Sequence, residues 1–180
     1  MKKGRLRWLG PGVTVFVTML LVFGAGTATA AGIKKHITLA PSAFTPENND
    51  VYYSLVQTES ACYLESEMPD QTACFFAPIT FQKGALFLRK AWIYLSENPD
   101  PVSAAPSVQV QIVKVDLSEG TTEIIAEDDM FTLDGYTGVQ EFELDTISQN
   151  EVIKDKFAYQ IKICVNDGVR IHGVKVRMKK

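Results

Sequence analysis

The 180-residue chain is poor in the residues from which metal and redox sites are usually built. It contains three cysteines and two histidines, and none of them stands at C-x-x-C or H-x-x-x-H spacing. A structural zinc site takes about four such ligands at close spacing, and a dithiol redox site takes a C-x-x-C pair. The sequence therefore predicts neither a zinc centre nor a thiol redox centre.

The two histidines, His36 and His172, give little support for acid–base catalysis. A catalytic histidine needs a nucleophile or a carboxylate within hydrogen-bond reach, and the chain has no G-x-S-x-G motif to supply one. His172 shares the alternation of Val174 and Val176, so we interpret it as a half-buried strand residue bonded to backbone. We expect no enzymatic activity and no catalytic residue.

Calcium and glycosidase motifs are also missing, although acidic residues cluster at positions 127–129 and 65–70. A glycosidase needs two carboxyl groups about 5 to 10 Å apart, and an EF-hand needs a D-x-D-x-D-G loop. Because neither pattern is present, we interpret both clusters as solvated turns. The sequence predicts no cofactor and no metal site, with calcium bound by loop carboxylates as the weaker alternative.

Long hydrophobic runs are absent outside the amino-terminal segment. There an apolar run at positions 13–23 follows four basic residues within positions 2–7, and the sequence Ala28-Thr29-Ala30 fits signal-peptidase cleavage. The run is shorter than the roughly 20 residues that span a bilayer, which disfavours an uncleaved anchor. We predict a signal peptide at residues 1–30 and a single secreted domain at 31–180, extracellular or periplasmic, without stable membrane insertion after cleavage.

An excess of positive charge is missing from the predicted mature chain. Of the 18 Lys and Arg residues, four lie in the predicted signal and 14 do not, against 21 Asp and Glu, so the remainder carries about seven net negative charges. Nucleic-acid binding requires a basic surface that neutralises phosphates, and anionic membranes likewise attract basic segments. We therefore expect no nucleic-acid partner.

Helical periodicity is nearly absent, whereas apolar and polar residues alternate with a period of two in many segments. Residues 157–165 and 174–179 alternate clearly, and Asn166-Asp167-Gly168 favours a turn, so we predict that the two segments form a hairpin. A second hairpin is predicted from residues 108–112, the turn 118–121 and the return 122–126. Its apolar phase slips after Ile112, which indicates either a β-bulge or a strand with two buried faces.

Further strands are predicted at residues 51–57, 61–65, 74–81, 86–95 and 139–144. The Pro-rich segment 97–106 is predicted to be a loop between strands rather than a domain boundary. Eight or nine short strands separated by turns are typical of an all-β protein, an antiparallel β-sandwich with a jelly-roll-like arrangement.

Several of these segments resemble a loose group of uncharacterised secreted bacterial β-sandwich proteins. The similar segments are 43–46, 74–79 followed by Gly84-Ala85, 113–117 with Gly120, 159–164 and 170–176. The chain departs from that group at its end, Met178-Lys179-Lys180, where many members have an aromatic residue. The shared motifs are strand cores and turns, so the resemblance implies an extracellular all-β fold and no catalytic or binding residue.

The cysteines of an exported protein meet an oxidising compartment and are therefore expected to be bridged. The residues alone leave two pairings open. Cys62 and Cys74 lie symmetrically about Met68 and would face each other across a hairpin, whereas Cys74 with Cys164 closes a longer loop. In the chain-entropy model the longer loop stabilises by about 4 to 5 kcal/mol and the shorter by about 3. The resemblance favours Cys74 with Cys164, because both lie in similar segments.

Trp92 and Tyr94 form the clearest pair of aromatic residues, since they point to the same side of one predicted strand. Flat exposed aromatic rings stack on sugar rings. Residues 91, 93 and 95 are also apolar, so either set can face the core, and we favour a buried tryptophan over a sugar platform.

These observations predict a secreted, non-enzymatic sandwich that acts as a surface, matrix or envelope-associated interaction protein. Its partner would be an unknown protein or glycan at the cell surface. The alternative function is a small carbohydrate-binding module, with or without the assistance of calcium.

Overall fold

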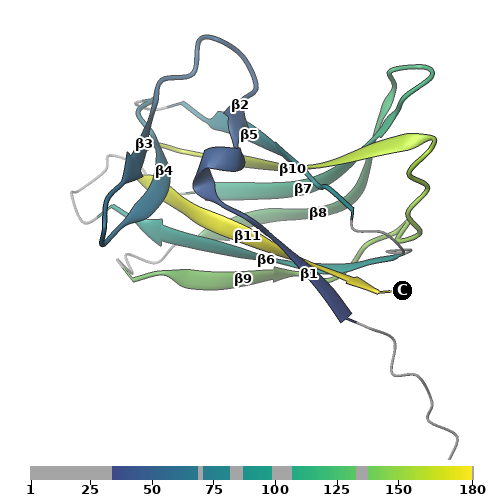
Figure 1. Cartoon of the computed structure of the whole chain (residues 1–180). Helices are drawn as coiled ribbons and strands as arrows, with labels where there is room; N and C mark the ends of the chain where they lie inside the picture. Colours follow the sequence, from purple (N-terminus) through teal and green to yellow (C-terminus); the bar gives the residue numbers. More distant parts are fainter. Residues whose placement is uncertain (1–33, 69–70, 82–86, 99–106, 133–137, 180) are drawn as a thin grey trace, which may run out of the picture. The chain divides into compact units, whose positions relative to one another are not determined.

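The computed structural model describes residues 34–68, 71–81, 87–98, 107–132 and 138–179. The predicted signal peptide, most of the predicted loop 97–106 and the centre of the predicted turn at 68–71 lie outside these residues. The described part contains eleven strands and one short 3-10 helix, arranged as two packed antiparallel sheets (Figure 1). The predicted all-β antiparallel sandwich is confirmed.

The elements follow in chain order: β1 (Lys34–Leu39), η1 (Pro41–Ala43), β2 (Thr45–Pro46), β3 (Tyr53–Gln57), β4 (Cys62–Ser66), β5 (Ala73–Pro78), β6 (Phe87–Glu97), β7 (Ser107–Asp116), β8 (Thr122–Thr132), β9 (Gln140–Leu144), β10 (Phe157–Val165) and β11 (Val169–Lys179). One sheet has the order β3-β4-β11-β6-β9, with β1 also paired to β11. The other has the order β2-β5-β10-β7-β8. Figure 1 shows them as two layers.

The core lies between the two sheets and consists of the inward residues of alternating strands. On β6 the inward residues Ala91, Ile93 and Leu95 are 0% exposed, and on β10 so are Ile161 and Ile163. Burying a large aliphatic side chain stabilises a fold by about 1.5 to 3 kcal/mol. Where apolar residues occupy only one side of a strand, as on β10, the period-two pattern of the sequence indicates the buried face.

The hairpin predicted from residues 157–165 and 174–179 is wrong. β10 pairs with β5 and β7 in the five-stranded sheet, whereas β11 pairs with β1, β4 and β6 in the other sheet. The turn between them, with Gly168 at φ 81°, passes the chain from one sheet to the other. Alternation identifies a buried face but not the pairing partner, and two strands joined by a tight turn can bury their faces against each other.

The second predicted hairpin is confirmed, because β7 and β8 pair along nearly their whole length. The register shifts between Ile112 and Val113, so the phase slip in the sequence corresponds to a bulge. The turn is fixed by Asp116, whose carboxylate accepts hydrogen bonds from the backbone N–H of Ser118 at 2.8 Å and of Glu119 at 3.2 Å.

The structure has more strands than the eight or nine predicted, because β1 and β2 were not recognised. The β1 sequence KKHITL has only two apolar residues, and β2 is two residues long, so neither produces a clear alternation. β11 also begins at Val169, five residues before the predicted start.

His172 is a half-buried strand residue as predicted, but a bulge in β11 at Gly173 changes the face of the strand on which it lies. The register against β6 shifts between Ile171 and Gly173, so His172 is not on the face of Val174 and Val176, which are fully buried. Gly173 has φ 140°, and a Cβ at this position would lie 2.7 Å from the backbone oxygen of Leu39. The close approach of β1 requires glycine here.

The disulfide joins Cys74 on β5 to Cys164 on β10, the pairing that the resemblance implied. The two residues are direct partners in the antiparallel register. Cys62 is exposed and unpaired. The alternative pairing of Cys62 with Cys74 does not form, because β4 and β5 belong to different sheets rather than to one hairpin.

Candidate functional site

The outer face of the five-stranded sheet contains an open groove of about 490 Å³. Ligand-binding clefts usually enclose about 300 to 1,000 Å³, so the groove is large enough for a small ligand. It crosses β5, β10, β7 and β8, and Glu47 closes one edge. We call it the five-stranded groove, and its lining residues are Glu47, Phe76, Gln111, Val113, Val115, Thr122, Ile124, Gln160 and Lys162.

The strand register brings these residues together from positions far apart in the chain. Lys162 on β10 lies opposite Phe76 on β5 and Gln111 on β7, and Gln160 lies opposite Val113 in the next row. The β7–β8 bulge leaves Ile124 facing outward, with 49% of its surface exposed, beside Val113. The floor of the groove is thus apolar, with amide side chains at its sides.

The polar side chains of the groove differ in whether they already form hydrogen bonds or ion pairs within the protein. The Lys162 ammonium pairs with Glu47 at 3.0 Å and lies 5.2 Å from the centre of the Phe76 ring. The amide nitrogen of Gln111 donates to Glu127. The amide of Gln160, in contrast, makes no hydrogen bond within the described part of the chain. It is free to donate to and accept from a ligand.

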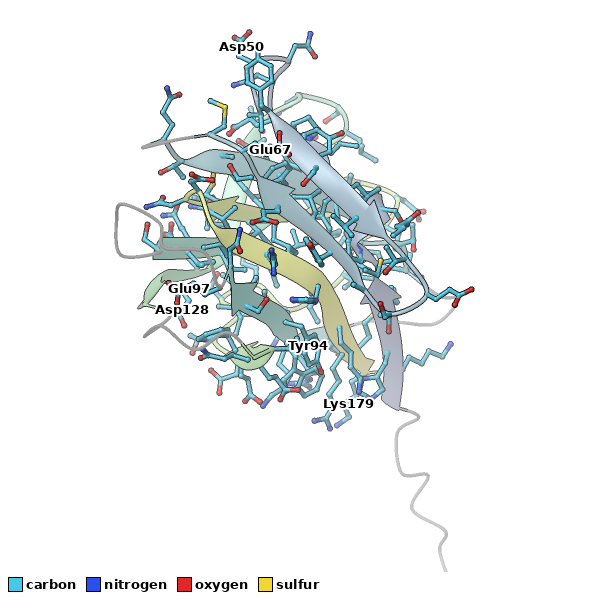
Figure 2. All side chains as sticks on the ribbon, turned by 90° about the vertical axis from the view of Figure 1, so that its left-hand side faces the viewer. Asp50, Glu67, Tyr94, Glu97, Asp128 and Lys179 are labelled. Carbon is cyan, nitrogen blue, oxygen red and sulfur yellow. A yellow bond between two sulfur atoms is a disulfide. The ribbon has the colours of Figure 1, made fainter. Side chains whose placement is uncertain are left out.

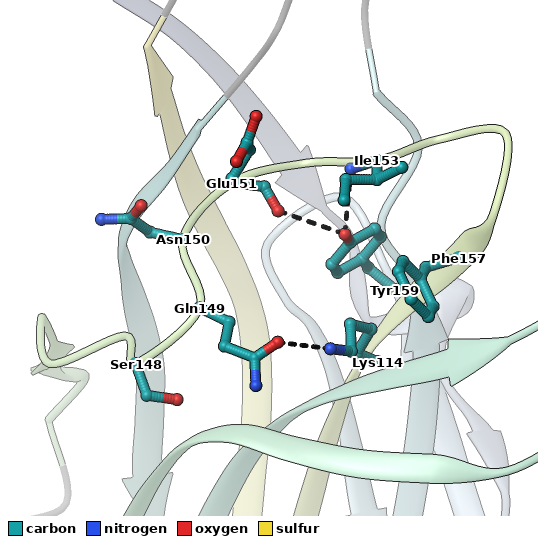
Figure 3. A pocket seen from close by; sticks show the side chains of 8 residues that line it. All are labelled: Lys114, Ser148, Gln149, Asn150, Glu151, Ile153, Phe157 and Tyr159. Carbon is teal, nitrogen blue, oxygen red and sulfur yellow. Dashed lines mark hydrogen bonds between the residues drawn. The ribbon is translucent and has the colours of Figure 1, made fainter.

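A second pocket of about 280 Å³ lies where the segment 148–153 crosses the sheet (Figure 3). The Tyr159 hydroxyl accepts a hydrogen bond from the backbone N–H of Ile153 at 3.1 Å and donates to the carbonyl of Glu151 at 3.3 Å. The Lys114 ammonium bonds Gln149 and lies 4.6 Å from the centre of the Phe157 ring. The same ammonium forms an ion pair with Glu123 on β8 at 2.6 Å.

Lys114, Ser148, Gln149 and Tyr159 in this second pocket are already hydrogen-bonded within the protein, whereas the Asn150 amide and the Glu151 carboxylate make no side-chain contact within the described residues. A buried ammonium or hydroxyl is stabilised when its hydrogen bonds are satisfied. These contacts hold the connection between β9 and β10 against the sheet, which is a structural role. We regard the five-stranded groove as the better candidate for a ligand site.

The outer face of the six-stranded sheet carries the aromatic residues singled out in the sequence. Ala91, Ile93 and Leu95 are buried, so the expectation of a buried Trp92 is wrong: Trp92 and Tyr94 face outward and are half-buried. Figure 2 labels Tyr94 beside β6. Their role in ligand binding stays a prediction.

The Trp92 ring is held by its neighbours on both sides. Its indole Nε1 donates a hydrogen bond of 2.9 Å to Glu143 on β9. The ammonium groups of Lys90 and Lys175 lie 5.6 and 5.5 Å from its ring centre, within the range of cation–π attraction. On the same strand, a hydrogen bond to the Glu141 carboxylate raises the pKa of Tyr94.

Among the described side chains, Ser96 and His172 form a serine–histidine hydrogen bond, with Oγ and Nε2 2.7 Å apart. Burial lowers the pKa of His172, against a weaker opposing effect of its hydrogen bond to the Cys62 backbone. The backbone bond expected from the sequence is thus present. Ser96 is only 3% exposed, so the pair links β6 to β11 and does not present a nucleophile to solvent.

The acidic residues at positions 65, 127 and 128 lie on strands rather than in the solvated turns expected from the sequence, whereas Glu67 is exposed beyond the end of β4 as expected and Asp70 lies outside the described residues. Glu127 and Asp128 belong to β8, and Glu65 on β4 accepts hydrogen bonds from Arg170 at 3.1 Å and Asn98 at 2.6 Å. Across the described ranges, no group of three or more His, Cys, Asp or Glu side chains is placed to hold a metal ion. Nor does this part of the chain include a helix of the length and hydrophobicity needed to cross a membrane.

No protein-family model and no curated protein matches the chain. Several solved structures are similar to it. The CBM22-1 and GH10 modules of the endo-1,4-β-D-xylanase 10B from Clostridium thermocellum, in complex with xylohexaose, match with a TM-score of 0.51 and 10% identity over 82% of this chain and 28% of that chain.

Two further similar structures are separate modules. The C-terminal CBM6 of LamC from Zobellia galactanivorans has a TM-score of 0.48 and 11% identity over 79% of this chain and 98% of its own. A family 35 carbohydrate-binding module from Clostridium thermocellum has a TM-score of 0.47 and 13% identity, over 79% and 97%. Identities this low establish a shared fold and nothing finer, so the conclusion is that the chain has an antiparallel β-sandwich fold of the kind found in the xylanase structure.

Proposed function

We propose that the protein is a non-catalytic carbohydrate-binding sandwich that acts outside the cytoplasm and holds a neutral oligosaccharide in the five-stranded groove. The observation that carries the proposal is the pairing of an uncommitted amide, Gln160, with an apolar floor in an open groove of about 490 Å³. A sugar ring presents both C–H faces and hydroxyl groups. It therefore fits a surface that combines apolar area with amide donors and acceptors.

The similar fold of the xylanase structure supports the proposal, since that structure holds xylohexaose. The disulfide between Cys74 and Cys164 supports export, because disulfides persist in oxidising compartments. In the groove, the apolar face of a sugar would lie on Val115 and Ile124. Its hydroxyl groups would bond Gln160 and the free acceptor side of Gln111.

The test is isothermal titration calorimetry of residues 31–180 with xylohexaose and with hexasaccharides of glucose and mannose, in the presence of calcium and of a chelator. Gln160→Ala removes the uncommitted amide, and we expect it to weaken binding about fivefold, the equivalent of about 1 kcal/mol for one hydrogen bond. Ile124→Ser should weaken binding as well, because it removes apolar floor. Gln57→Ala is the matched control, because Gln57 is an exposed glutamine on β3 in the other sheet.

Two results would contradict the proposal. One is the absence of binding to every neutral hexasaccharide at millimolar concentration. The other is binding that Gln160→Ala and Ile124→Ser leave unchanged. Loss of affinity on chelation would additionally support the calcium-assisted form of the hypothesis.

A second candidate function, protein binding, is favoured by β3. This strand lies at the end of the described six-stranded sheet, and Tyr53 and Leu55 on it are 39% and 41% exposed. The preceding residue, Tyr52, is 70% exposed. An edge strand with exposed apolar side chains can accept an added strand from a partner.

Protein binding at β3 can be tested with Leu55→Lys, which places a charge on the edge strand. In chemical cross-linking on the surface of the producing cell, we expect the wild type to be linked to a partner protein and Leu55→Lys not to be linked to it. Capture that is equal for the wild type and Leu55→Lys would argue against the β3 edge as an interface.

A further inference from the structure

The outer face of the six-stranded sheet has a chemistry different from that of the five-stranded groove. Around Trp92, four cationic side chains gather on two neighbouring strands. β6 contributes Lys90, and β11 contributes the alternate residues Lys175, Arg177 and Lys179. Figure 2 labels Lys179 near the end of β11. We call the surface formed by Trp92 and these four cations the Trp92 face.

The strand register fixes the Trp92 face as a continuous surface. Lys175 lies directly opposite Trp92, and Arg177 lies directly opposite Lys90. On the far side of β11, His36 of β1 lies opposite Arg177 and is exposed. Alternate residues along a strand are about 6.6 Å apart, so the cations of β11 form a row beside the indole ring.

The charges on this face are only partly neutralised. Glu143 on β9 bonds both Lys90 and the indole of Trp92. The Lys90 ammonium holds the pKa of Glu143 below its usual range, so this carboxylate stays ionised. No described carboxylate lies within ion-pair distance of Lys175 or Arg177. The face therefore carries excess positive charge on a chain whose net charge is −3.

We infer that the Trp92 face is a second binding site, which takes an acidic polysaccharide that carries a carboxylate on each sugar, a polyuronate. The indole ring is oriented by its hydrogen bond to Glu143 and lies 5.9 Å, centre to centre, from the ring of His36 on β1. A sugar ring would therefore stack on the part of the indole that the Lys175 ammonium covers in the free protein. Lys175 has no ion-pair partner, so its ammonium can leave the indole face and meet a sugar carboxylate. Arg177 can bind the carboxylate of the next sugar, in the bidentate geometry that guanidinium groups favour.

Other polyanions fit this face less well. Duplex DNA carries one charge per roughly 1.7 Å, which a patch of four cations on an acidic chain neutralises poorly. An anionic bilayer is held by protruding basic segments and inserted apolar side chains. Trp92 is half-buried at the middle of a strand and is tied to Glu143, so it does not protrude.

The inference concerns a different surface and a different ligand from those of the proposed function, so either can fail without the other. The test uses the whole domain and hexagalacturonate as the probe, with fully methyl-esterified hexagalacturonate as the uncharged ligand of the same backbone. We expect binding of the acidic hexamer that weakens as salt rises, because the contacts are between exposed charges. The ester should not bind.

Lys175→Gln and Arg177→Gln should each weaken binding of the acidic hexamer about fivefold, the equivalent of about 1 kcal/mol for an exposed charge pair. Trp92→Phe, which keeps an aromatic ring but removes the indole N–H, should weaken it to a similar extent. Lys156→Gln is the matched control, because the Lys156 ammonium also lies over an aromatic ring, at 5.0 Å from the centre of Phe157, but away from this face. It should bind the hexamer as the wild type does.

Three results would overturn the inference. They are the absence of hexagalacturonate binding at low salt, equal affinities of the wild type and Lys175→Gln, and tighter binding of dextran sulfate or of phosphatidylglycerol vesicles than of hexagalacturonate. Thermal melting of each variant shows whether it is folded. A variant that melts as the wild type does and loses only the acidic hexamer supports the assignment.

Discussion

Replacing Gly173 by alanine is expected to destabilise the sandwich far more than replacing Gly120 by alanine. Both glycines have positive φ, 140° and 69°, but only Gly173 has a backbone atom in the place of the new Cβ. A Cβ at Gly173 would lie 2.7 Å from the Leu39 oxygen, whereas nothing lies within 4 Å of one at Gly120. The two variants therefore share the strain of a positive φ and differ in the steric contact.

The magnitudes follow from these two contributions. At Gly120 a left-handed alanine costs about 1 to 2 kcal/mol, offset by about 0.4 to 1 because alanine is less free than glycine in the unfolded chain. At Gly173 the unusual φ costs about 1 to 3 kcal/mol, and the overpacking against Leu39 adds about 1 to 3. With the same offset, we expect a net loss of about 1 kcal/mol for Gly120→Ala and about 3 for Gly173→Ala.

Differential scanning calorimetry measures both variants directly. For a domain of this size about 1 kcal/mol corresponds to about 2 to 4 °C in Tm, so Gly120→Ala should melt about 3 °C and Gly173→Ala about 9 °C below the wild type. Because the contact is with the end of β1, hydrogen exchange should also accelerate at the β1 amides in Gly173→Ala only. Equal melting temperatures for the two variants would refute the role of the Leu39 contact.

Three other changes are expected to alter stability in measurable ways. The double variant Cys74→Ala/Cys164→Ala removes a cross-link between residues 90 positions apart in the sequence. In urea denaturation it should lower the free energy of unfolding by about 4 to 5 kcal/mol. Cys62→Ser removes an exposed free thiol and should leave the free energy of unfolding unchanged. Tyr159→Phe leaves the backbone N–H of Ile153 without its acceptor and should lower the free energy of unfolding by about 1 to 2 kcal/mol in the same assay. Unchanged stability would argue against a role of the Tyr159 hydroxyl in holding the segment before β10. Burial lowers the pKa of His172 below 6.5, so the folded state binds fewer protons than the unfolded state and its stability should fall as pH drops below about 6.5. His172→Gln should show a smaller loss of Tm between pH 7 and pH 5, and an unchanged pH profile would contradict the assignment.

The sequence predicted the fold class well, because alternation is a direct consequence of burying one face of a strand. The β7–β8 hairpin was predictable too, since its turn residues and its phase slip are local. The pairing of β10 was not. Its neighbours are β5 and β7, and nothing in residues 157–165 distinguishes these partners from the adjacent β11.

The candidate sites show the same limit. Gln111 and Gln160 each alternate with core residues in the sequence, but they share a groove only because β7 and β10 pair in one register. The face of Trp92 was ambiguous, since residues on both sides of that strand are apolar. The burial of Ala91, Ile93 and Leu95 decides it. The bulge at Gly173, which no alternation reveals, likewise decides the side on which His172 lies.

The two binding sites that we propose on the outer faces of the sandwich differ in how their side chains are held. On the five-stranded sheet, Cys74 and Cys164 lie two residues along their strands from Phe76 and Lys162, so the disulfide fixes the register of β5 and β10, two of the four strands that form the groove. A ligand in the proposed groove would meet side chains whose positions are already set, which is the arrangement expected for a neutral sugar held by short-range contacts. On the six-stranded sheet, the Lys175 ammonium stands at the end of a flexible side chain and has no ion-pair partner within the described residues. It can therefore move to meet the carboxylate of a charged ligand. The affinities of the two sites should therefore respond differently to salt. Added salt should weaken binding of an acidic ligand at the Trp92 face, because it screens exposed charges, and should hardly change binding of a neutral sugar in the five-stranded groove.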